Sequence, residues 1–264
     1  MRFEMFCGCR PTPIFKAARR DELVDRDRPE IRRLTSRLRR VVRAFLREQA
    51  ASIAQQVAIT RTMLGKAAGD DADRILASLH LEQWQALAGA LFPLFADMVQ
   101  AGARAAAAQS RLVDDIDRLL MLTNDSAIDY ARTRSAELVS EIAESTRRMI
   151  RANIVQALQD GMSNDELAAL LQRGYAFSRE RSEMIARTET AFADVEGNLL
   201  AYEQSGVVQS KKWITGAGCC DLCDELNGKV VPLKANFPGG RKGPPLHPHC
   251  RCDIVPVLKE KDDA

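Results

Sequence analysis

Two pairs of potential metal ligands lie near the C-terminal end of this 264-residue chain. Cys220 and Cys223 have C-x2-C spacing, and His247 and Cys250 have H-x2-C spacing. A tetrahedral zinc site suits two such pairs, because each turn supplies two adjacent ligands and the chain between them folds back. We therefore predict a structural zinc ion bound by Cys220, Cys223, His247 and Cys250. A closed shell of this kind stabilises a fold without performing catalysis.

The ligand set has alternatives within the same segment. Cys252 is the strongest alternative fourth ligand, and His249 could replace His247. A catalytic zinc would keep an open position and need a carboxylate base, for which Asp221, Asp224 and Glu225 are nearby. The chain has no H-E-x-x-H motif and no H-x-E followed by P-C-x-x-C. We therefore favour a non-enzymatic protein and keep a zinc-dependent nucleic-acid-processing enzyme or effector as the alternative.

The composition supports metal binding over a disulfide scaffold. Five of the seven cysteines lie between residues 219 and 252, whereas a secreted scaffold would spread them along the chain. The 38 basic and 36 acidic residues give a net charge of +2, which excludes a wholly acidic or wholly basic protein. We find no apolar run of the ~18 residues that a membrane-spanning helix needs, and no secretory signal at residues 1–10. The sequence therefore predicts no membrane partner.

Proline residues mark the expected boundaries of the chain. After Pro29 only Pro93 occurs before Pro232, so about 200 residues are free to form helices. We predict an N-terminal arm at residues 1–30, a helical region at 31–160 and a C-terminal domain at 161–264. Pro93 is expected to break or kink its helix. Ser163 and Glu166 form a predicted capping box, and a further helix is expected from about Ser178 to Ser205.

The segment after Gly206 has the pattern of a small β-rich module at residues 206–258. Strands are expected at 211–215, 229–233 and 252–258, with Asn227-Gly228 as a tight turn. Pro256 favours an edge position for the third strand. A module with so few apolar residues needs an additional staple, which the zinc ion would supply. The predicted fold class is α+β: a long, mainly helical N-terminal region followed by a small, zinc-stapled β module.

A basic face is expected on the first long helix. Residues 1–47 hold 14 basic and six acidic side chains. The apolar side chains of the helix recur at helical spacing and leave a row of arginines on the opposite face. This face is either a solvated surface or a sequence-independent contact with DNA phosphates or with an acidic partner. The candidate contact residues are Arg32, Arg33, Arg37, Arg40 and Arg43.

The order of motifs resembles a known family. Arg187-Thr188-Glu189 is followed by Asn198, Lys212-Trp213, C-x2-C at 220–223, an L-N-G-K turn at 226–229 and P-P-L-H-P-H-C-R-C at 244–252. Over about residues 150–257 this order is similar to the phage Mu F-like head morphogenesis proteins, which are minor head proteins of tailed bacteriophages. The chain has Asn227 where the family usually has Asp, and both residues suit the turn.

The resemblance implies a structural protein of the phage head. Such a protein would associate with the portal or the capsid interior and act in procapsid assembly and in DNA packaging or ejection. The implied partners are the portal protein and the major capsid or scaffolding protein, with possible non-specific contact with packaged DNA. The implied location is the virion, and the host cytoplasm during assembly. By matching position, Cys220, Cys223, His247 and Cys250 would be the metal-linked residues.

The resemblance does not assign roles to Arg187, Glu189 and Asn198, for which two interpretations stay open. Arg187 and Glu189 are two residues apart on a helix and so do not face each other, whereas Glu183 lies one turn before Arg187. The first interpretation is an ion pair between Arg187 and Glu183 on the helix surface. The second is that the polar groups of residues 187–198 pack against the zinc module and fix the junction.

Overall fold

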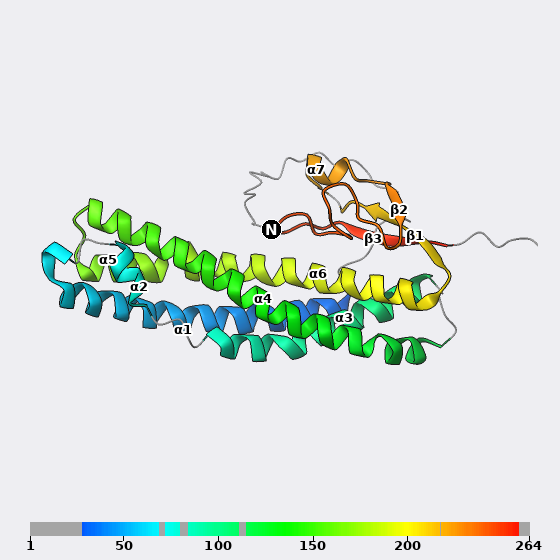
Figure 1. The fold of residues 1–264 in the computed structure, drawn as a ribbon, viewed down its shortest axis with the longest axis horizontal. Coiled ribbons are helices and arrows are strands. Elements are labelled where there is room, and N and C mark those ends of the chain that lie inside the picture. Colours follow the sequence, from blue (N-terminus) through cyan, green and yellow to red (C-terminus); the bar gives the residue numbers. More distant parts are fainter. Residues whose placement is uncertain (1–27, 69–71, 80–83, 111–114, 217, 259–264) are drawn as a thin grey trace, which may run out of the picture. The chain divides into compact units, whose positions relative to one another are not determined.

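The computed structural model describes residues 28–68, 72–79, 84–110, 115–216 and 218–258. Most of the predicted N-terminal arm, with Cys7 and Cys9, lies outside these residues. The elements follow the chain in the order labelled in Figure 1: α1 (Pro29–Ala68), α2 (Ala72–Ala77), α3 (Trp84–Ser110), α4 (Ile116–Gln159), α5 (Asn164–Arg173), η1 (Tyr175–Phe177), α6 (Arg179–Ser205), β1 (Val208–Ile214), α7 (Asp221–Asp224), β2 (Val230–Pro232) and β3 (Asp253–Leu258). The mainly helical chain with a small C-terminal sheet confirms the coarse fold prediction.

The residues separate into two compact units, each built from segments that are not consecutive in the sequence. The helical unit comprises residues 36–94 and 131–186, and the sheet unit comprises the described residues of 1–35, 95–130 and 187–264. The core of the helical unit confirms the predicted apolar face of α1, since Leu38 and Val42 are fully buried. Trp84 is buried beside Phe45, with ring centroids 5.1 Å apart, and its indole N–H donates to Gln49 Oε1 at 3.0 Å.

Helix α3 continues through Pro93, so of the two expected outcomes, a break or a kink, the break does not occur. Proline removes the hydrogen bond to the carbonyl four residues earlier, here that of Gly89. Gly89 and Pro93 both lie on the exposed face of the helix, where water can solvate the freed carbonyl. The flanking residues Leu87, Leu91 and Leu94 remain buried and hold both halves of the turn in place.

Helix α3 also bears on the membrane prediction. Its Trp84–Ala108 stretch is long and apolar enough to cross a membrane by length and composition, although no single apolar run in the sequence reaches that length. Half of this stretch is buried inside the protein, and a buried core helix passes the same test. The composition of α3 therefore fits a core helix, and it alone is weak evidence for a membrane span.

A buried arginine anchors the helical unit, and sequence patterning did not predict it. Arg181 in the first turn of α6 is only 2% exposed. Its guanidinium donates to Thr146 Oγ1 at 2.8 Å, Ser145 Oγ at 2.7 Å and the Ile142 carbonyl at 3.2 Å, all on α4. It also donates to the carbonyl of Ala176 in η1. Burial lowers the pKa of Arg181 to about 10, and the four neutral acceptors compensate for the lost hydration.

The capping box that the sequence predicts is present in the same unit. The Glu166 amide donates to Ser163 Oγ at 3.3 Å, and the Ser163 amide donates to Glu166 Oε2 at 2.8 Å. These bonds satisfy amides that would otherwise lack partners at the start of α5. The predicted ends of the neighbouring helices are also close to those observed, because α4 ends at Gln159 before Gly161 and α6 ends at Ser205 before Gly206.

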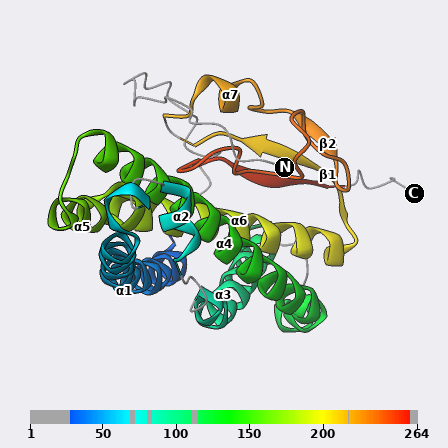
Figure 2. The ribbon, with the colours of Figure 1, turned by 60° about the vertical axis from the view of Figure 1, so that its left-hand side comes forward.

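The sheet unit holds a three-stranded antiparallel sheet in the order β2-β1-β3. Lys211 in the central strand is opposite Val231 on one side and Pro256 on the other. Strand β3 is therefore at an edge, which confirms the prediction made from Pro256. Figure 2 shows the strands beside α6. Side chains from both elements form one core with Trp213 and Phe237, whose rings meet edge to face at 5.2 Å.

Close backbone contact fixes the helices of the sheet unit. A Cβ atom at Gly197 of α6 would lie 2.2 Å from the Val99 carbonyl of α3. A larger residue cannot fit at that position without moving a helix. The same contact brings Asp194 beside Gly102, and Arg28 forms an ion pair with this buried carboxylate. Helices α6 and α3 are therefore in close backbone contact within the sheet unit.

Candidate metal centre

The first ligand pair lies on the short turn that contains α7. Cys220 is the residue just before the helix. Its carbonyl accepts hydrogen bonds from the amides of Cys223 at 3.0 Å and Asp224 at 2.9 Å. This single helical turn places the Cys220 and Cys223 side chains on the same side. Cys223 is buried, and Cys220 is half-buried. The three acidic residues of the turn, Asp221, Asp224 and Glu225, are exposed.

The second pair lies on the loop that precedes β3. The Cys250 amide donates to the His247 carbonyl at 3.2 Å, which closes the turn between them. His249 adopts a left-handed conformation with φ of 61° within this turn. The His249 backbone amide donates to Thr188 Oγ1 of α6 at 3.2 Å. The loop is thus tied to α6 just beside its potential ligands.

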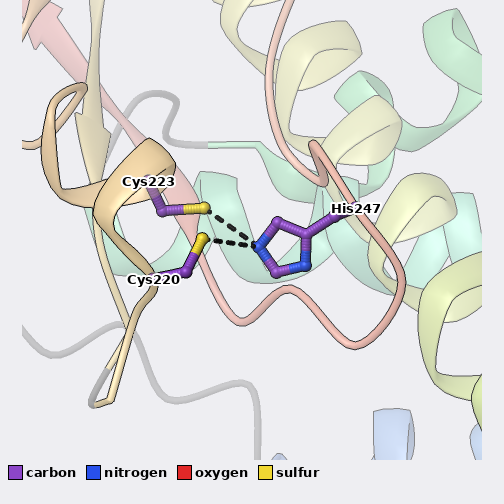
Figure 3. Close-up of side chains that lie close together, drawn as sticks. All are labelled: Cys220, Cys223 and His247. Carbon is purple, nitrogen blue, oxygen red and sulfur yellow. Dashed lines mark hydrogen bonds between the residues drawn. The ribbon is translucent and has the colours of Figure 1, made fainter. Parts of the chain in front are cut away.

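The two pairs converge in space, as Figure 3 shows for three of the side chains. The sulfurs of Cys220 and Cys223 each lie 3.3 Å from His247 Nε2, and the sulfurs of Cys223 and Cys250 are 3.7 Å apart. Zinc–sulfur bonds of about 2.3 Å and zinc–nitrogen bonds of about 2.0–2.1 Å imply tetrahedral edges of about 3.8 Å and 3.5 Å. The observed separations are therefore close to those of a tetrahedral zinc shell.

The imidazole of His247 is oriented for metal binding. Its Nδ1 lies 2.8 Å from the carbonyl of Pro248 and donates to it, so Nε2 is the ring nitrogen that faces the sulfurs. Hydrogen bonding with the Cys250 sulfur raises the pKa of His247 to about 9, against the effect of burial. Without a metal the imidazole thus holds a proton toward these sulfurs. A divalent cation bound at Nε2 would take the place of that proton.

The sulfurs also favour a cation between them. Hydrogen bonds from Cys223 and Cys252 lower the pKa of Cys250, while hydrogen bonding to Cys250 and Cys252 raises the pKa of Cys223. A first thiolate is therefore stabilised, but a second negative charge beside it is disfavoured. Zinc coordination would supply the positive charge that lets several of these thiols ionise together.

The alternative ligands have different surroundings. Cys252 is 1% exposed and forms a second group with Cys223 and Cys250, in which all sulfurs lie within 4.8 Å of one another. Cys252 therefore stays a candidate ligand. His249 is exposed and belongs to neither potential metal group found among the described residues. Cys219 is also outside both groups, and its sulfur lies 3.8 Å from Asp224 Oδ1.

Polar residues of α6 bond to the module, in agreement with the second interpretation of the 187–198 segment. Asn198 Nδ2 donates to Asp253 Oδ1 at 3.1 Å, and both residues are buried. The Tyr202 hydroxyl donates to the Ile254 carbonyl at 3.2 Å. Glu183, which the first interpretation pairs with Arg187, accepts a hydrogen bond from Arg39 at 2.9 Å. Asn198, Tyr202 and Thr188 therefore link the helix to the start of β3 and to the ligand loop.

Two residues of this unit were missed by the sequence analysis. Asp253 follows the cysteine motif directly, and only its burial against Asn198 reveals its role. Lys211 looks like an ordinary charged residue of an alternating strand, yet it is fully buried and its Nζ has no hydrogen-bond partner among the described residues. Its ammonium group lies 5.7 Å from the centroid of the Phe237 ring. The alternation Lys211-Lys212-Trp213 gave no signal that one lysine is buried.

The predicted basic face of α1 is exposed. Arg37, Arg40 and Arg43 belong to the helical unit, while Arg32 and Arg33 belong to the part of α1 in the sheet unit, and all five side chains are exposed. This exposure is compatible with both a solvated face and a binding face. The role of these arginines stays a prediction.

Comparison with known protein families finds a match in the C-terminal part of the chain. Residues 148–255 match the model of the family described as "Phage Mu protein F like protein". The match covers less than half of the chain and includes both ligand pairs. It confirms the resemblance that the motif order indicates, within the C-terminal part.

A curated relative and the solved structures add little on function. The chain is 24% identical over 168 residues to the uncharacterized protein YqbB of Bacillus subtilis (strain 168), covering 57% of this chain and 55% of the relative. The chain thus spans about half the length of the curated relative it matches. No solved structure matches the chain.

Proposed function

We propose that the chain is a minor head protein of a tailed bacteriophage that acts structurally in head morphogenesis and is not an enzyme. The observation that carries the proposal is the convergence of the two ligand pairs inside a segment that matches a family of structural phage head proteins. The polar bonds from α6 to the module support a structural role as well, because they link the helix to the loop that carries His247 and Cys250 and to the start of β3.

We propose zinc as the metal, held by Cys220, Cys223, His247 and Cys250. Thiolate and neutral imidazole are the ligands that zinc prefers, and His247 has the backbone hydrogen bond that commonly orients a zinc-bound imidazole. Four protein ligands would leave no open position for a substrate or an activated water. The role of the ion in this proposal is to join the α7 turn to the loop before β3.

The proposed partners are the portal protein and the major capsid or scaffolding protein, on the interior of the head. The protein would be in the host cytoplasm during assembly and in the virion afterwards, with a part in DNA packaging or ejection. The exposed arginines of α1 would contact the phosphates of packaged DNA without regard to sequence. A location inside a filled head would provide such DNA at high concentration.

Co-purification with the portal protein of the same phage tests the head assignment. The two proteins are expressed together, and the tagged portal is purified under reducing conditions with zinc present. The chain is expected to elute with the assembled portal. A Cys219→Ser variant, changed outside both donor groups, should behave as the wild type. The same purification is repeated with tagged capsid precursors in place of the portal. If the assembled portal and the assembled capsid precursors both elute without the chain, the proposed association is wrong.

Salt-dependent DNA binding tests the arginine face separately. Replacement of Arg32, Arg33, Arg37, Arg40 and Arg43 by Ala should weaken binding to duplex DNA and lower the slope of log affinity against log salt, by up to about 0.9 for each lost phosphate contact. The control removes the same charge from five exposed arginines elsewhere: Arg118, Arg132, Arg148, Arg173 and Arg179. Equal losses in both variants would show that net charge, and not this face, determines binding.

A further inference from the structure

The sulfur cluster contains more donors than one four-coordinate ion needs. Cys223 belongs to two overlapping groups, one with Cys220 and His247 and the other with Cys250 and Cys252. These five residues offer four sulfurs and one nitrogen, so at least one donor is left over when a single tetrahedral ion is bound, and it is a thiol whenever His247 is a ligand. The surplus indicates that these sulfurs can also react with one another.

Cys223 and Cys250 are the best placed pair for such a reaction. Their sulfurs are 3.7 Å apart and hydrogen-bonded, and the two residues are 27 positions apart in the sequence, on different loops. A disulfide bond is about 2.05 Å long, so closure requires the sulfurs to approach by about 1.7 Å. We propose that the metal-free protein forms a Cys223–Cys250 disulfide, a redox modification site that joins the same two loops as the metal ion.

A low-molecular-weight disulfide such as oxidised glutathione is the proposed oxidant, and Cys220 is the proposed point of entry because it is more exposed than Cys223. The Cys220 thiolate attacks the glutathione disulfide and releases one glutathione thiolate. The Cys223 thiolate then attacks the Cys220 sulfur and releases the second glutathione. Finally the Cys250 thiolate attacks the Cys223 sulfur and regenerates the free Cys220 thiolate. Two protein thiols lose two electrons and two protons, and one glutathione disulfide becomes two thiols.

The proposed disulfide would be an alternative cross-link between the two loops that the metal ion joins. Cytoplasmic thiols stay reduced, whereas disulfides persist in oxidising surroundings outside the cell. The reduced cluster would bind the ion, and the oxidised cluster would keep the α7 turn and the loop before β3 joined after the ion is lost. Cys252, which is buried within reach of both sulfurs, would stay reduced in this form.

Disulfide mapping of the full chain tests the proposal. The reduced protein is freed of metal with a chelator, incubated with oxidised glutathione, blocked with an alkylating reagent and digested with trypsin without reduction. Cleavage after Arg251 separates Cys250 from Cys252, so mass spectrometry distinguishes their cross-links. Fragmentation of the linked peptide distinguishes Cys223 from Cys219 and Cys220. The Cys223–Cys250 link is expected to exceed Cys223–Cys252 by about tenfold or more.

Variants and a denatured control sharpen the result. Cys252→Ser should leave the yield of the Cys223–Cys250 link unchanged, while Cys220→Ser should slow its formation about tenfold because the entry thiol is missing. In guanidinium chloride the links should scatter among all cysteines. The proposal is overturned if the native protein gives the same scatter, gives mainly the Cys223–Cys252 link, or stops at glutathione adducts.

A comparison of zinc-saturated and metal-free protein tests this inference separately from the proposed function. If zinc binds at the cluster, zinc-saturated protein should form the cross-link about tenfold more slowly than metal-free protein, because its thiolates are engaged. This comparison alone rests on the proposed zinc site. Formation of the cross-link with no protection by zinc would refute the zinc assignment and leave the disulfide established.

Discussion

The helical unit and the β module hold distant segments together with different chemistry. The helical unit has many buried apolar side chains. It also contains the buried Arg181, whose guanidinium bonds to oxygens of α4 and of η1. The module has three short strands and few buried apolar residues, and its two ligand loops meet at sulfur and imidazole groups. A large core tolerates the loss of one contact, whereas a small module depends on the groups that join its loops.

Metal removal is the largest expected effect and should affect the two regions unequally. In a Trp84→Phe background the only remaining tryptophan is Trp213, which is fully buried in the module core. Chelation under reducing conditions should lower the denaturant concentration at which Trp213 emission shifts to longer wavelength, while the far-UV helical transition changes little. Cys223→Ser should lower it in the same way without a chelator, because Cys223 belongs to both donor groups, and Cys219→Ser should not. An unchanged Trp213 transition after verified metal removal would show that the module does not depend on a metal ion.

Loss of the buried arginine is expected to destabilise the helical unit next most strongly. Arg181→Ala removes the guanidinium that donates to the Thr146 hydroxyl and to the buried Ala176 carbonyl, so we expect about 2–4 kcal/mol lower free energy of unfolding. Chemical denaturation followed by circular dichroism measures this loss. Arg179→Ala, at an exposed position of the same helix, should change the free energy by no more than about 0.5 kcal/mol. Similar effects of the two variants would show that Arg181 has no special role.

Breaking the link between α6 and β3 should cost less. Asn198→Ala removes a donor from the buried Asp253 carboxylate, which still accepts the Ile254 amide at 2.8 Å. We expect a loss of about 1–3 kcal/mol in the stability of the module, measured by Trp213 emission during denaturation. Gln204→Ala, at an exposed position on α6, is the matched control. A loss of module stability in the control as large as that in Asn198→Ala would argue against this link.

The smallest predicted effect is a gain of stability in the sheet unit. Lys211 is fully buried, and its ammonium has no hydrogen-bond partner among the described residues, so Lys211→Met should stabilise the protein by about 1 kcal/mol. Lys212→Met changes the adjacent, partly exposed lysine and is the control. A stability loss in Lys211→Met would show that the buried ammonium contributes favourably.

The pH dependence of this gain has a defined sign. Burial lowers the pKa of Lys211 from its ordinary value of 10.5 to about 8. Between these values the unfolded chain binds more protons than the folded protein, so the stability contribution of Lys211 rises with pH. The advantage of Lys211→Met over the wild type should therefore be largest below pH 8 and disappear toward pH 10.5. An advantage that does not change across this range would contradict the lowered pKa.

The sequence by itself predicted the features that depend on residues a few positions apart. Apolar spacing located the long helices, Ser163 and Glu166 marked the start of α5, and Pro256 placed β3 at an edge. The C-x2-C and H-x2-C spacings identified the ligand types. Pro93 was the exception, because the consequence of its missing hydrogen bond depends on whether the freed carbonyl faces water.

Only the tertiary structure decided which distant groups meet. Cys223 approaches His247 and Cys250, which lie 24 and 27 positions further along the chain, and spacing alone could not show that Cys250 and Cys252 both lie near it. The same holds for Arg181 and Lys211, since a charged residue carries no local mark of burial. Burial and convergence depend on how α6, the sheet and the loops pack, and that packing is set by contacts between residues far apart in the sequence.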